Sequence, residues 1–141
     1  MTRYLLDTVT LSELRKTTKA AAPVLRWQYA AQGRQASVSV ITMNEIWYGY
    51  RKVAERDPAF ARRLEIWYGE ILASPDFYTL LPVSLAIAKL AADYRANHGC
   101  SHNDSLIAAT ANIHNLTLAT RNIADFQATG IQLVNPWEYS L

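Results

Sequence analysis

The sequence has a single cysteine, Cys100, so the chain cannot form an internal disulfide. A chain of this kind is in keeping with a reducing compartment. No apolar run is long enough to span a bilayer, and the short run at residues 4–6 is too brief for a secretion signal. These absences exclude disulfide-stabilised extracellular folds and membrane-spanning proteins. They predict a soluble, cytoplasmic protein that does not associate with membranes.

Charged residues are also scarce, at 18% of the 141 residues, compared with about a quarter in an average protein. An acidic residue within an apolar segment is therefore more informative here than on an acid-rich surface. The formal net charge of +2 is compatible with a polyanionic partner but does not establish one. Half of the residues are apolar, and no repeat or linker divides the chain, so we expect residues 1–141 to form one domain.

Short β-rich runs alternate with helical patterns along the chain. We expect strands at 3–6, 36–41, 77–83, 116–120 and 131–134, and helices at 11–16, 22–32, 43–54, 58–73, 85–97 and 104–114. Gly33 is expected to close the second helix, Thr42 to cap the third with Glu45 in its first turn, and residues 121–126 to form a loop or short turn. The alternation predicts an α/β fold, with a mostly parallel central sheet flanked by helices on both sides.

Four acidic residues are placed where such a sheet gathers its functional groups. Asp7 directly follows the first strand, and Glu45 lies in the helix after the second strand. Asp104 opens a later helix, and Asp125 follows the fourth strand after a short loop. In an open parallel sheet, ligands bind outside the carboxyl ends of the strands. The four carboxylates could therefore converge on one site.

Each of these acids also has a purely structural interpretation. An Asp at a strand end often forms a turn or caps a helix, and a Glu in a first turn interacts favourably with the helix dipole. Asp104 is an ordinary candidate for an N-cap. The residue pattern alone leaves the structural and the functional interpretations open.

Three segments carry a resemblance to a known family. They are "YLLDTVTLSELRK" at the start, "SVSVITMNEIWYGYRK" in the middle and "NDSLIAATANIHNLTLATRNIADFQATGIQLVNPWE" at the end. The chain resembles the PIN-domain nucleases and, within them, the VapC-type toxins of type II toxin–antitoxin pairs, in particular the FitB-like branch. Only residues 55–100 match loosely. The resemblance implies a PIN fold and endonucleolytic hydrolysis of RNA by water, which leaves a 5′ phosphate and a 3′ hydroxyl.

The resemblance also assigns the site residues and a metal cofactor. It implies Asp7, Glu45 and Asp104 as metal ligands, Asp125 as a fourth acid for a second ion or the attacking water, and Thr8 and Asn122 as supporting polar groups. The ion is expected to be Mg²⁺ or Mn²⁺, because hard divalent cations select oxygen ligands. Arg121 is the expected contact for a substrate phosphate, because it shares a loop with Asn122 and Asp125.

One position departs from the family pattern. Val9 stands where the family usually has a polar residue, most often Asn, and a valine side chain cannot form a hydrogen bond. The groups that orient Asp7 would then be incomplete. The alternative to an active nuclease is therefore a catalytically weakened PIN-like binding or regulatory module.

The resemblance implies three partners besides the RNA substrate. They are a second copy of the chain in a homodimer, a VapB-like antitoxin whose segment lies in an apolar groove and shields the acidic site, and operator DNA bound only through the antitoxin. The aromatic residues at helical spacing indicate core packing or an oligomer interface more than base stacking. These aromatic residues are Trp27, Trp47, Tyr48, Tyr50, Trp67 and Tyr68.

Overall fold

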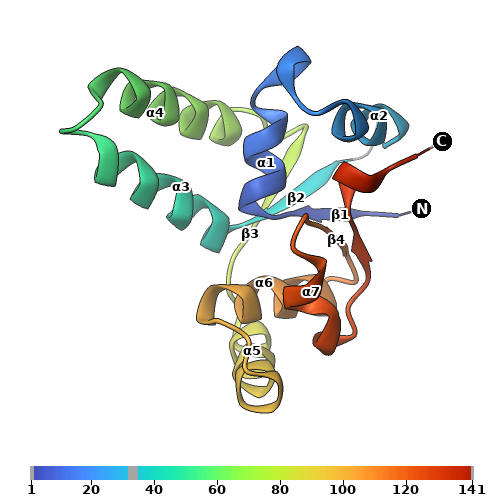
Figure 1. Cartoon of the computed structure of the whole chain (residues 1–141). Coiled ribbons are helices and arrows are strands. Elements are labelled where there is room, and N and C mark those ends of the chain that lie inside the picture. The colour runs from blue at the N-terminus through green and yellow to red at the C-terminus, as the bar shows by residue number, and fades with distance from the viewer. Residues whose placement is uncertain (1, 32–34, 141) are drawn as a thin grey trace.

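A parallel sheet of five strands forms the centre of the protein (Figure 1). The computed structural model describes residues 2–31 and 35–140. The strands are β1 (Tyr4–Leu6), β2 (Ala36–Ser39), β3 (Tyr78–Leu81), β4 (Thr117–Ala119) and β5 (Leu133–Val134). They are ordered β3-β2-β1-β4-β5, and every neighbouring pair is parallel. The predicted α/β fold is confirmed, with β1 at the centre of the sheet.

Helices cover both faces of the sheet, with α1 to α4 on one side and α5 to α7 on the other (Figure 1). Their bounds are α1 (Thr8–Leu14), α2 (Ala22–Ala30), α3 (Val40–Val53), α4 (Pro58–Leu72), α5 (Leu85–His98), α6 (His102–Ile113) and α7 (Ile123–Phe126). Three single turns of 3₁₀ helix, η1 (Thr17–Lys19), η2 (Gln127–Thr129) and η3 (Pro136–Glu138), complete the chain. Within the described ranges, none of these helices has the length and apolar character needed to cross a bilayer.

The central strand divides the apolar core into two layers. Leu5 is fully buried in the cluster under α5 and α6, whereas Leu6 is buried in the cluster under α1 to α4. Successive side chains of a strand point to opposite faces, so one continuous apolar run supplies both layers. The "YLL" run is therefore suited to a strand that is covered on both sides.

The start of α3 differs from the sequence prediction. The helix begins at Val40, and the hydroxyl of Ser39 caps it by accepting a hydrogen bond from the backbone N–H of Ile41 at 3.0 Å. Thr42 is fully buried inside the helix and is not its cap. The prediction that Glu45 lies in the first turn is therefore wrong, and Glu45 lies one turn further along. The β-branched residues at 40–42 had extended the predicted strand too far.

The start of α6 also differs from the prediction. Ser101 is the N-cap, and its side-chain oxygen accepts a hydrogen bond from the backbone N–H of Asp104 at 3.2 Å. Asp104 therefore lies in the first turn of α6 and does not open the helix. An acidic residue at this position interacts favourably with the positive end of the helix dipole.

Two further boundaries move for similar reasons. The first helix begins at Thr8, three residues before the predicted start at Leu11, because Asp7 acts as its N-cap. Residues 121–126, predicted as a loop or short turn, contain the four-residue helix α7. The predicted helix end at Gly33 lies outside the described residues.

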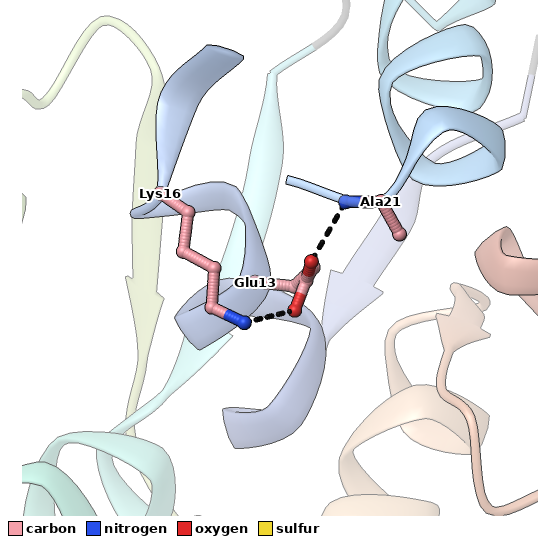
Figure 2. Close-up of polar contacts among 3 residues, drawn as sticks. All are labelled: Glu13, Lys16 and Ala21. Atoms are coloured by element: carbon pink, nitrogen blue, oxygen red, sulfur yellow. Dashed lines mark hydrogen bonds and ion pairs between the residues drawn. The ribbon is translucent and has the colours of Figure 1, made fainter. Parts of the chain in front are cut away.

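Glu13 fixes the connection between α1 and α2 (Figure 2). Its Oε1 accepts a hydrogen bond from Lys16 Nζ at 2.9 Å, and its Oε2 accepts one from the backbone N–H of Ala21 at 2.8 Å. The bond from Lys16, followed by the bond from Ala21, lowers the pKa of Glu13. Thr17 in this connection has a φ of 52°, which is strained for a β-branched residue. The Glu13 carboxylate therefore stabilises a strained turn by bonding to residues on both sides of it.

The core predicts a clear difference between two apolar truncations. Leu118 on β4 is fully buried, whereas Ile113 at the end of α6 is 45% exposed. Leu118→Ala should lower the free energy of unfolding by about 2–5 kcal/mol, because it leaves a cavity between the sheet and its helices. Ile113→Ala should change it by less than about 0.5 kcal/mol. Urea denaturation of the two variants measures the difference, and equal losses would contradict this packing.

Candidate active site

Asp7 lies at the carboxyl end of β1 and is 8% exposed. The backbone N–H of Thr10 donates a hydrogen bond to Oδ1 at 2.8 Å, and the hydroxyl of Thr120 donates one to Oδ2 at 2.6 Å. A buried carboxylate requires such donors, because they replace the water that it loses. Asp7 therefore caps α1 and is held in a fixed orientation, so its structural and functional interpretations are compatible.

Thr120 is a site residue that the sequence analysis missed. It directly follows β4 and is fully buried. Its oxygen donates to Asp7 and also accepts a hydrogen bond from the backbone N–H of Asn122 at 3.0 Å. Thr120 therefore connects Asp7 to the loop that carries Asn122 and Asp125. The available signal was a hydroxyl residue at the carboxyl end of a predicted strand, which is where site residues gather.

Glu45 reaches the same region from α3. Its Oε1 accepts a hydrogen bond from the hydroxyl of Thr8 at 3.1 Å. Burial is the main reason that the pKa of Glu45 is raised; the bond from Thr8 opposes the shift, and the charges of Asp104 and Asp7 add to it. Glu45 is therefore close enough to both acids to feel their charges.

Asp104 approaches from the first turn of α6. Burial is the main reason that its pKa is raised, and the hydrogen bond with Ser101 opposes this shift. The charges of Asp125 and Asp7 raise the pKa further. Asp7 is buried and Asp125 is exposed, so the four acids extend from the end of the sheet to the surface. The structure brings all four predicted acids into one region of negative charge.

The acid side chains are near one another but not yet arranged as a ligand set. In the part of the chain that the structure describes, no group of three or more Asp, Glu, His or Cys side chains is placed to hold a metal ion. Their chemistry nevertheless fits a hard divalent cation, since all the donors are oxygens and a cation would offset their mutual repulsion. Binding would require the carboxylates to turn toward a common point.

The remaining predicted residues lie on the loop after β4. Arg121 is exposed, and its Cζ lies 5.3 Å from the centroid of the Trp137 ring. Arg121, Asn122 and Asp125 line a shallow cleft of about 510 Å³ that also reaches Glu138. Arg121 is therefore directed toward the C-terminal turn and lines the same cleft as Asp125.

Val9 leaves Asp7 fully hydrogen-bonded. The valine lies in the first turn of α1 and is 42% exposed. The two carboxylate oxygens of Asp7 already have donors in Thr10 and Thr120. The polar side chain that the family usually has at position 9 is therefore not needed to orient Asp7 in this chain.

The bond from Thr120 predicts a specific loss of stability. Thr120→Val keeps the side-chain shape but leaves one oxygen of a buried carboxylate without its donor. We expect the free energy of unfolding to fall by about 1.5–3 kcal/mol, the usual range for a hydrogen bond to a charged group. Thr120→Ser, which keeps the hydroxyl, should retain most of the wild-type stability. Urea denaturation at pH 7 measures both, and a valine variant as stable as wild type would contradict the assignment.

The raised pKa of Glu45 predicts how stability varies with pH. A carboxyl whose pKa is raised above its ordinary value of 4.5 binds protons more readily in the folded state than in the unfolded state. Its contribution to stability therefore falls as the pH rises from 4.5 through the pKa of the folded state. In the presence of a chelator at pH 7, Glu45→Gln should therefore melt at a higher temperature than wild type. The difference should shrink as the pH is lowered toward 4.5. A lower melting temperature for Glu45→Gln at pH 7 would contradict the shift.

Comparisons with known proteins agree with this fold and sequence. Residues 4–131 match the model of the PIN domain. A VapC ribonuclease, Y4jK, from Sinorhizobium fredii is 35% identical, with 94% of this chain and 96% of that protein covered. The crystal structure of FitAcB from Neisseria gonorrhoeae matches with a TM-score of 0.76 at 26% identity, and covers 96% of this chain and 99% of the other.

A toxin–antitoxin complex from Klebsiella pneumoniae has a chain of the same fold, with a TM-score of 0.69 at 24% identity; the match covers 96% of this chain and 98% of the other. The match to the family model covers most of the chain, and the resemblance inferred from the three sequence segments is confirmed. The chain belongs to the PIN-domain family, in its VapC-type branch.

Proposed function

We propose that this protein is a metal-dependent endoribonuclease, the toxin of a toxin–antitoxin pair, which hydrolyses RNA phosphodiester bonds with water. The observation that carries the proposal is the buried carboxylate of Asp7, held by Thr10 and Thr120 in the neighbourhood of Glu45 and Asp104. Membership of the PIN family and similarity to a ribonuclease of Sinorhizobium fredii support the same chemistry.

The acids have distinct proposed roles. Asp7, Glu45 and Asp104 hold Mg²⁺ or Mn²⁺, and Asp125 holds a second ion or the attacking water. A cation held by these carboxylates would supply Lewis-acid chemistry: it would orient the scissile phosphate, lower the pKa of a water and offset charge on the leaving oxygen. Thr120 and Thr10 keep the carboxylate of Asp7 aimed, and Thr8 does the same for Glu45.

Two residues on the loop after β4 have supporting roles in the proposal. The side chain of Asn122 makes no capping bond to α7 within the described residues, so its amide can hydrogen-bond to the substrate or to water. Arg121 directly precedes Asn122, and its guanidinium group is proposed to contact an RNA phosphate. Both residues line the same cleft as Asp125, which supports these roles.

The antitoxin is proposed to bind a large apolar cavity on the side of the sheet that α1 to α4 cover. This cavity, of about 660 Å³, is lined by Leu11, Leu14, Leu25, Trp27, Ile71 and Phe77 among other residues. The first residues of β1, β2 and β3 also line it, so it lies toward the amino end of the sheet, whereas Asp7 lies at the carboxyl end of β1. An apolar segment of a VapB-like antitoxin would bind there, a further segment of the same partner would have to extend to the acids to shield them, and operator DNA would be bound through that partner. The toxin–antitoxin complex from Klebsiella pneumoniae supports this pairing.

A homodimer is the oligomeric state that we propose. Strand β3 is an edge strand of the sheet, and Leu80 on it is 36% exposed. Leu85, at the start of the following helix, is 85% exposed. Apolar side chains of this size beside an open sheet edge support association with a second copy.

An RNA cleavage assay tests the proposed activity. The wild-type protein should cleave single-stranded RNA in Mg²⁺ or Mn²⁺ and lose this activity when a chelator removes the ion. Asp7→Asn should lower cleavage to background, because it removes a carboxylate charge; the amide oxygen can still accept from the backbone N–H of Thr10, and the amide NH2 can donate to the hydroxyl oxygen of Thr120. Asp76→Asn, at an exposed position, should cleave like wild type. Undiminished cleavage by a folded Asp7→Asn variant would contradict the assignment.

The same assay separates the enzyme from the weakened module. Because Asp7 is fully hydrogen-bonded without a polar neighbour at position 9, Val9→Asn should change the cleavage rate by less than about tenfold. Activity in the Val9→Asn variant alone would favour a binding or regulatory module.

A further inference from the structure

Helix α3 carries three aromatic residues just beyond Glu45, and two of them have packing partners. The ring of Trp47 lies 4.8 Å from that of Tyr50 and 4.9 Å from that of Tyr68 on α4. The hydroxyl of Tyr50 also donates a hydrogen bond to Glu65 on α4 at 3.2 Å. For these residues, packing between α3 and α4 is the main role, as the sequence analysis expected.

Tyr48 is not part of the packing between α3 and α4. Its side chain is 64% exposed, and the one aromatic or cationic contact that its ring makes within the described residues is with Lys52. The Nζ atom of Lys52 lies 5.8 Å from the centroid of the ring. Packing therefore does not account for this tyrosine, and much of its ring is open to solvent.

The position of Tyr48 relative to the acids is set by the helix. Glu45, Tyr48 and Lys52 occupy positions i, i+3 and i+7 of α3, so they lie one above another along one side of the helix. At the first of these positions, Glu45 accepts a hydrogen bond from the hydroxyl of Thr8 on α1. An exposed aromatic ring therefore lies one helical turn from the acidic site, with the exposed side chain of Lys52 a further turn away.

A site made of four acids needs affinity for RNA from elsewhere, because the carboxylates repel the phosphates of the strand. An exposed aromatic ring stacks on any base, and a lysine attracts the adjoining phosphate. We propose that Tyr48 and Lys52 form a nucleotide subsite, in which a base next to the scissile bond stacks on the Tyr48 ring and its phosphate contacts Lys52. The subsite rests on the proposed ribonuclease function and supplies its substrate affinity.

Equilibrium binding of a 12-nucleotide oligoadenylate RNA with a fluorescent end label tests the subsite. Binding is measured in Mg²⁺ with the full chain carrying Asp7→Asn, so that cleavage does not consume the probe. In this background, Tyr48→Ala should weaken binding about 5- to 150-fold, the range expected for the loss of one stacked base. Tyr48→Phe keeps the ring and should bind within about twofold of its parent.

Lys52→Ala should weaken binding and reduce the slope of log Kd against log salt by about 0.7, the value for one phosphate contact on a single strand. Two exposed residues on other helices provide matched controls, Tyr29→Ala on α2 for the ring and Lys89→Ala on α5 for the charge, and both should bind like their parent. Size-exclusion chromatography of each variant checks that the oligomeric state is unchanged.

Several results would overturn the subsite. The first is that the parent does not bind the probe, and the second is that Tyr48→Ala binds it as tightly as the parent. The third is that Tyr48→Ala binds more weakly only because its oligomeric state has changed. The proposed function fails separately, when the chain with Asp7 intact does not cleave RNA in Mg²⁺ or Mn²⁺. Because binding is measured in a variant that is not expected to cleave, each outcome is assigned to one proposal alone.

Discussion

The carboxylate of Asp7, buried at the end of the central strand, is the constraint on which the site depends. A charge that is 8% exposed is tolerated because Thr10 and Thr120 donate to its two oxygens. These bonds join the end of the first strand and the start of the first helix to the loop after β4, in which Thr120 is 113 residues away from Asp7. Thr10 strengthens the same junction, since its hydroxyl donates to the backbone oxygen of Ala119 at 2.8 Å. The site is therefore built on the most buried part of the sheet.

Around this fixed group, the other acids are less constrained. Glu45 has one hydrogen bond from Thr8, and Asp104 is held only through the cap of its helix by Ser101. Burial and mutual repulsion raise the pKa of both carboxyls, so the ionised cluster stores unfavourable electrostatic energy. A divalent cation would relieve that repulsion, and the side chains with fewer bonds are free to turn toward it. This division between one rigid and several less constrained acids is compatible with the proposed binding of an ion and a phosphate.

The fold could be predicted from the sequence because short apolar runs typical of buried strands alternate regularly with segments of helical periodicity. The run around Leu5 and Leu6 predicted a strand covered on both faces, and the regular alternation of elements predicted the parallel sheet. The sequence misplaced two helix starts. Ser39 and Ser101 are the N-caps, but nearby residues that also suit a strand or a cap, Thr42 and Asp104, had been assigned to these positions. Thr120 was missed because its partner is 113 residues away. The exposure of Tyr48 depends on how α3 packs on α4, which local periodicity does not reveal.

The most direct test of the account is an equilibrium titration with Mn²⁺, in which electron paramagnetic resonance counts the free ion. The account predicts saturable binding by the wild-type protein, accompanied by proton release at mildly acidic pH because the carboxyls of Glu45 and Asp104 have raised pKa values. It also predicts much weaker binding by Asp104→Asn. No saturable binding by wild type, or equal affinity in the folded Asp104→Asn variant, would contradict the claim that these acids together hold a cation.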